Sequence, residues 1–76
     1  MTPKALEQVR AEALFISHVQ SSDRPDAGLV RTTVMRTIRQ HGPRGCAELV
    51  ALEYGEHPDI AVSRMCWVLS LVRSTY

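Results

Sequence analysis

Two cysteines and three histidines are the side chains of this 76-residue chain that could support nucleophilic or metal chemistry. Cys46 lies near His41, and a cysteine nucleophile needs such a base in an electropositive, accessible site. However, Cys46 and Cys66 each lie in an apolar stretch, which is typical of buried, reduced cysteines. We therefore interpret both thiols as structural. No pair of carboxylates is spaced for acid–base work, so we predict that the chain is not an enzyme.

A metal site would need ligands in close sequence pairs. The candidate ligands are spread out instead, and their C-x₁₀-H-x₈-C spacing matches no zinc finger or zinc knuckle. These candidates are His41, Cys46, His57 and Cys66. The four glycines are equally scattered, so the sequence contains no phosphate-binding loop. We predict neither a bound metal nor a cofactor.

Charged residues are segregated along the chain, although the formal net charge is only +1. Four arginines and no acid lie between Ala27 and Ala47, whereas four acids and no base lie between Glu48 and Asp59. Clustered arginines could contact the phosphates of a nucleic acid. The alternative is a solvated helix face, paired with the acids that follow it. The candidate nucleic-acid surface consists of Arg31, Arg36 and Arg39, all predicted to be exposed, together with Arg64.

The elements that must position these side chains are all helical, because apolar residues recur at helical spacing and convincing strand alternation is absent. Thr2 can cap a first helix that begins at Pro3, and Asp23 or Asp26 can cap the next. Gly42 is placed as a left-handed helix terminator, and Pro43 stops continuation. We predict an all-α, four-helix bundle-like fold in a single domain, 1–76. The predicted helices span about 3–20, 26–41, 44–54 and 58–73.

The last predicted helix is apolar on nearly every side. Its inward stripe consists of Ala61, Met65, Val68 and Val72. The remaining apolar side must meet the first helix, whose segment 13–16 is apolar all round, or another copy of the chain. In the second case Trp67 and Leu71 form a self-association surface; in the first, Trp67 fills the core of a compact monomer. The candidate interaction surface is Phe15, Met65, Trp67 and Leu71.

The segment 47–65 resembles the helix-turn-helix motif of DNA-binding proteins. Ala51, Gly55 and Val62 match the small residue of the first helix, the turn glycine and the aliphatic residue of the second helix. Ser63-Arg64 resembles the polar pair that often follows. The resemblance implies DNA binding through the second helix. The predicted turn, 55–59, is longer than the family pattern and carries acidic residues.

The sequence is compatible with two functions. The leading interpretation is a small, non-enzymatic protein–protein interaction module, a regulatory or accessory protein that self-associates. The alternative is a helix-turn-helix-like transcriptional regulator. Two cysteines make no disulfide framework, no signal peptide is visible, and no apolar run approaches the ~20 residues of a membrane span. We therefore expect a cytoplasmic protein with no membrane contact and no small-molecule ligand.

Overall fold

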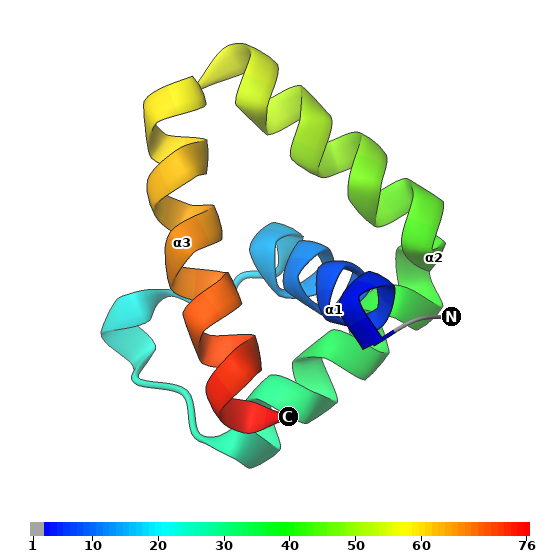
Figure 1. Cartoon of the computed structure of the whole chain (residues 1–76), viewed down its shortest axis with the longest axis vertical. Coiled ribbons are helices and arrows are strands. Elements are labelled where there is room, and N and C mark those ends of the chain that lie inside the picture. The colour runs from blue at the N-terminus through cyan, green and yellow to red at the C-terminus, as the bar shows by residue number, and fades with distance from the viewer. Residues whose placement is uncertain (1–2) are drawn as a thin grey trace.

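The computed structural model describes residues 3–76, and within them the chain is all-α, as predicted. Figure 1 shows the first helix lying between the other two, which pack against each other and against it. Thr2, the predicted cap of the first helix, lies outside the described residues. The elements are α1 (Pro3–Ile16), the short 3₁₀ turn η1 (Ser21–Asp23), α2 (Ala27–Glu56) and α3 (Pro58–Thr75).

The predicted four-helix bundle is wrong, because the second and third predicted helices form the two halves of one kinked helix, α2. Gly42, with φ 71° and ψ 163°, is the non-helical residue between them. Its positive φ was expected, but helical structure resumes at once because proline fits the first position of a helix. Asp26 caps α2 by accepting a hydrogen bond from the Leu29 backbone N–H at 2.8 Å.

The first helix ends at Ile16 rather than near residue 20. The Ser17 hydroxyl donates to the Leu14 carbonyl at 2.6 Å and accepts a hydrogen bond from the Val19 N–H at 3.3 Å. Such side-chain bonds to the local backbone compete with helical ones. Arg64 on α3 donates hydrogen bonds to further backbone carbonyls of this segment. These carbonyls are therefore not used to extend α1.

The core joins the end of α1 to both neighbouring helices. The predicted inward stripe of α3 is confirmed at Ala61, Val68 and Val72, which are fully or almost fully buried, while Met65 is half-buried. The all-round apolar end of α1 also meets neighbours on both sides, as expected. Leu49, in the second half of α2, lies outside this core and is 40% exposed. The buried hydrophobic residues are Ala11, Ala13, Leu14, Phe15, Val30, Val34, Cys46, Val50, Ala61, Val68 and Val72.

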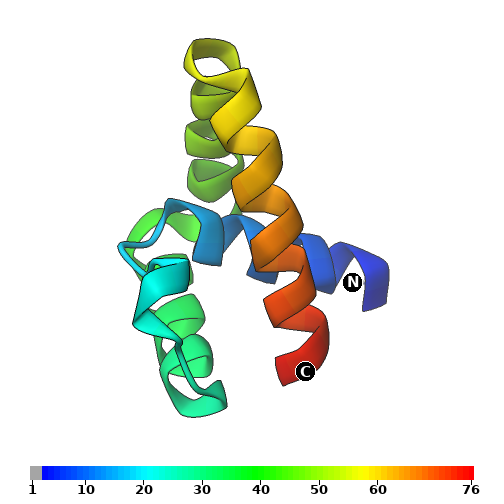
Figure 2. The ribbon, with the colours of Figure 1, turned by 90° about the vertical axis from the view of Figure 1, so that its left-hand side faces the viewer.

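The connection from α2 to α3 is much shorter than the predicted turn 55–59. His57 is the non-helical residue between the two helices, and its backbone N–H donates to the Glu53 carbonyl at 2.7 Å. Pro58 then opens α3. Figure 2 shows the end of α2 and the start of α3 meeting at the top of the molecule. One residue therefore separates the two helices, where the sequence predicts a turn over 55–59.

Candidate interaction site

The structure places the predicted self-association residues mainly inside the fold. Phe15 is 4% exposed, while Met65, Trp67 and Leu71 are half-buried and pack against the core. Phe15 also stacks on the Tyr54 ring, with the centroids 6.1 Å apart. Different apolar side chains are available at the surface. The exposed large ones are Leu29, Met35, Leu49, Leu52, Ile60, Val62 and Tyr76.

Arg64, one of the predicted nucleic-acid contacts, is bound to the carbonyl groups at the end of α1. Its Nε donates to the Phe15 carbonyl at 2.6 Å. Its Nη2 lies 3.2, 3.0 and 3.0 Å from the carbonyl oxygens of Leu14, Ser17 and Val19. The guanidinium carbon also lies 5.6 Å from the Trp67 ring centroid. Arg64 thus caps α1 from a different helix, and desolvation by its surroundings lowers its pKa.

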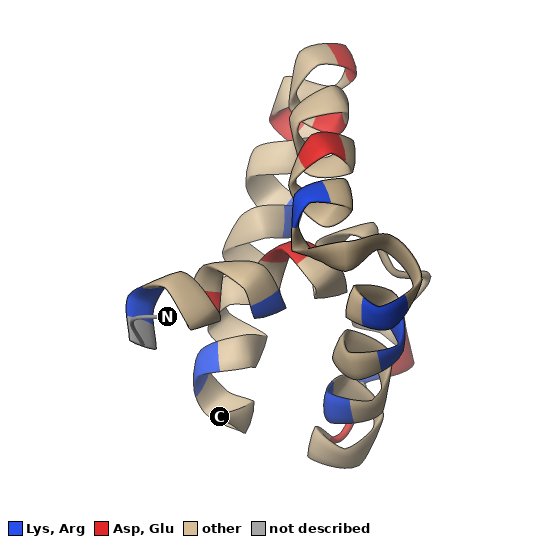
Figure 3. Ribbon diagram, turned by 90° about the vertical axis from the view of Figure 1, so that its right-hand side faces the viewer, with Lys and Arg blue, Asp and Glu red and all other residues tan. Residues whose placement is uncertain are grey.

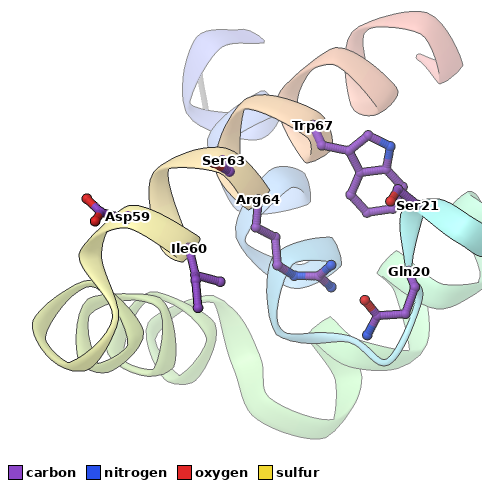
Figure 4. Close-up of a pocket in the computed structure, with 7 residues that line it drawn as sticks. All are labelled: Gln20, Ser21, Asp59, Ile60, Ser63, Arg64 and Trp67. Carbon is purple, nitrogen blue, oxygen red and sulfur yellow. The ribbon is translucent and has the colours of Figure 1, made fainter.

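A cavity of about 470 Å³ lies beside Arg64, between α3 and the segment that follows α1. Figure 4 shows the Arg64 side chain directed toward that segment, with the Trp67 ring beside Ser21 and the Asp59 carboxylate pointing away. The positively charged side chain of this cavity, Arg64, already donates its hydrogen bonds to the carbonyls at the end of α1. The cavity therefore offers little charge to an incoming ligand.

The other three predicted arginines are exposed, as expected, but they lie on two sides of α2. Arg31 and Arg39 line one groove, where Arg10 of α1 joins them. Arg36 lines a separate cavity of about 340 Å³, together with His18 and His41. The first half of α2 therefore does not present one continuous arginine face.

The groove between α1, the first half of α2 and Tyr76 combines an apolar lining with a cationic rim. Its volume is about 440 Å³. The guanidinium carbons of Arg10 and Arg31 lie 3.8 and 5.9 Å from the centroid of the Tyr76 ring. Arg31 Nη2 also donates to the Thr75 carbonyl at 3.0 Å. We call this site the arginine groove; it is lined by Leu6, Arg10, Arg31, Val34, Met35, Ile38, Arg39 and Tyr76.

The arginine groove suits a partner that is both apolar and anionic. Among residues 3–76, the side chains that line the groove include three arginines and no Asp or Glu. Met35 and Tyr76 are 54% and 46% exposed, which leaves apolar surface open at the rim. The sequence did not predict that Arg10 and Tyr76 belong to this site. They lie on α1 and at the end of α3, and no sequence spacing indicates that they lie near Arg39.

The cysteine and histidine candidates do not form a site. Among residues 3–76, no three His, Cys, Asp or Glu side chains lie close enough to hold a metal ion. Cys46 is buried, as expected, but Cys66 is exposed, contrary to expectation. Burial raises the pKa of the Cys46 thiol, and the charge of Glu12 raises it further. Both effects disfavour the thiolate that a nucleophile requires.

Replacing Glu12 with glutamine should stabilise the protein at neutral pH. Burial raises the pKa of this carboxyl above its usual 4.5, and the hydrogen bond from Gln8 opposes the shift only in part. The folded state therefore holds the proton more tightly, and stability falls as pH rises from 4.5 through the folded pKa. Urea unfolding at about pH 7 should show Glu12→Gln as the more stable protein, with the gain vanishing below about pH 4. An equal gain at both pH values would contradict this explanation.

In the part of the chain that the structure describes, no helix is long and apolar enough to cross a membrane. Comparisons of the chain with protein-family models, with curated proteins and with solved structures found no match.

Proposed function

We propose that this protein is a helical protein-interaction module whose arginine groove binds an acidic, amphipathic helix of a partner. The observation that carries the proposal is the groove itself, where the described residues place three arginines beside apolar side chains and no Asp or Glu. Partners of this chemistry insert apolar anchors into a groove and place their acids against its rim. Arginine is well suited to the rim because its planar fork binds carboxylates through two parallel hydrogen bonds.

The size of the groove also supports a peptide-like anchor. At about 440 Å³ it lies within the roughly 300–1,000 Å³ of typical ligand pockets. It is open at the surface where Met35 is exposed, so side chains on successive turns of a helix can reach it. The aromatic ring of Tyr76 and the two guanidinium groups beside it add residue types that dominate interface energetics.

Fluorescence anisotropy with a labelled synthetic peptide tests this proposal. The peptide is an acidic helix with leucines at i, i+3, i+4 and i+7, and its counterpart carries lysine in place of every glutamate. We expect the acidic peptide to bind and the lysine peptide not to bind. The double variant Met35→Gln/Arg39→Gln should weaken binding at least about tenfold, as expected when an anchor contact is lost.

Arg36→Gln is the matched control, because it makes the same change on the same helix but outside the groove. It should leave peptide binding unchanged, since Arg36 lines a different cavity. Equal weakening by Arg36→Gln and by the groove variant would contradict a defined groove. Such a result would indicate attraction to the whole basic segment instead.

DNA binding is the second candidate function, and the exposure of Arg31, Arg36 and Arg39 is the observation in its favour. In that case all three arginines should contribute, and affinity for duplex DNA should fall steeply with salt because phosphate contacts release counterions. The helix-turn-helix form of this hypothesis is weaker. Arg64 is held by α1, and Asp59 lies at the start of the helix that would read bases. Gel-shift titration at low salt, with Arg36→Gln alongside wild type, separates the two functions.

A further inference from the structure

The second half of α2 carries a surface that complements the arginine groove. Glu48, Leu52 and Glu56 follow one another at intervals of one helical turn, and Leu49 lies beside them. All four are exposed, with Leu49 at 40% and Leu52 at 55%. We call these four residues the acidic stripe. An exposed pair of leucines flanked by acids on one helix is the chemistry that the groove accepts.

We propose that the acidic stripe of one copy of this chain docks in the arginine groove of another copy. The inference rests on the proposed function, because it identifies the helix that the groove holds. The stripe places two carboxylates beside two leucines, and the groove places three arginines around an apolar lining, so charge and hydropathy match together.

The two surfaces lie too far apart for one molecule to join them itself. Figure 3 shows the acidic residues of the second half of α2 at one end of the molecule and the basic residues of its first half at the other. The kinked helix α2 carries the stripe beyond Gly42 and a wall of the groove before it. The contact must therefore form between copies. Because each copy brings one surface of each kind, two copies can join in a reciprocal pair, or successive copies can join head to tail.

The contact should be weak and sensitive to salt. The stripe extends over only about two turns of helix, so it buries less surface than the stable interfaces of roughly 1,200–2,000 Å². Its ion pairs lie at the edge of the groove, and raising ionic strength from about 0.1 to 1 M shortens the screening length from about 10 to 3 Å. We therefore expect association at high micromolar concentration and dissociation in molar salt.

Two double variants, each lacking one surface, test the proposal by sedimentation. Met35→Gln/Arg39→Gln removes groove contacts, and Leu52→Gln/Glu56→Gln removes stripe contacts. All four positions are exposed and glutamine is a good helix former, so both variants should retain the circular dichroism of wild type. Wild type should gain mass with concentration, and each variant alone should remain monomeric. A one-to-one mixture should form a heterodimer and nothing larger, because only one functional contact remains.

The same experiment gives the outcomes that overturn the inference. A wild-type protein that stays monomeric at high micromolar concentration would refute it, as would association that survives in both variants. A mixture of the variants that remains monomeric would also refute it. In each case, binding of the synthetic acidic peptide shows which proposal has failed. If the peptide binds, the proposed function stands and the partner is another protein. If the peptide does not bind, the proposed function and the self-association are both refuted. Arg36→Gln should associate like wild type.

Discussion

Replacing Arg64 with alanine should cost about 2–4 kcal/mol of folding free energy, because hydrogen bonds from a charged donor to several backbone carbonyls are lost together. The guanidinium reaches the carbonyls of Leu14, Phe15, Ser17 and Val19. Without it, the carbonyls of Phe15, Ser17 and Val19 lose this charged donor, whereas the Leu14 carbonyl keeps its hydrogen bond from the Ser17 hydroxyl. In a domain of this size, the midpoint of thermal unfolding should fall by about 10 °C or more.

The matched control for Arg64 is Arg73 on the same helix. Arg73 is exposed and pairs with Glu7, and an exposed ion pair contributes only about 0–1 kcal/mol. Thermal unfolding of Arg73→Ala should therefore resemble wild type. Arg64→Lys should rescue less than half of the loss, because an ammonium group cannot reach carbonyls on both sides of the helix end. Full rescue by lysine would show that charge, rather than the fork of donors, is what stabilises α1.

Gly42→Ala should destabilise the protein by about 1–3 kcal/mol, the usual strain of a side chain in a backbone conformation reserved for glycine. Gly42 has φ 71° and ψ 163°, and a Cβ built there would meet no atom within 4 Å. The expected loss therefore comes from the backbone alone and not from a clash. Denaturant unfolding measures it directly as a lower midpoint.

Gly55→Ala provides a control of opposite sign. Gly55 lies inside α2, and a Cβ there also meets nothing within 4 Å. Because glycine weakens a helix relative to alanine, this variant should gain about 0.5–1 kcal/mol. The two alanine variants should thus move the midpoint in opposite directions. If both variants lowered the midpoint, the loss in Gly42→Ala could not be assigned to the positive φ of Gly42.

Local sequence signals predicted the helices well and their assembly poorly. The apolar spacing predicts that Ala61, Val68 and Val72 share one face, which is buried, and Gly42 has the positive φ that the sequence predicts. The error was to treat that glycine as the end of a helix, since Pro43 can begin a helical segment as readily as it stops one. The end of α1 at Ile16 could not be predicted from the neighbouring residues alone. It also depends on hydrogen bonds from Arg64, which is distant in sequence.

The candidate site was harder to predict than the core. Exposure of Arg31 and Arg39 followed from their spacing, but the groove also needs Arg10 and Tyr76 from other helices. The sequence predicts Trp67 and Leu71 as interface residues because the last predicted helix is apolar on nearly every side. The central position of α1 provides a partner for these apolar sides, since both long helices pack against it. The apolar surface left over lies at positions such as Leu52 and Met35.

The link between Arg64 and the end of α1 also bears on the order in which the chain folds. It joins groups 45 to 50 positions apart, so it closes most of the chain into a loop. An isolated helix of 14 residues, the length of α1, is close to marginal in water, because helices of about 12–15 residues or fewer barely offset the cost of nucleation. During synthesis, α1 leaves the ribosome long before Arg64, the residue that caps it, has been added to the chain. The first helix therefore becomes stable only when the last one arrives, and folding should be a single cooperative event that waits for nearly the whole chain.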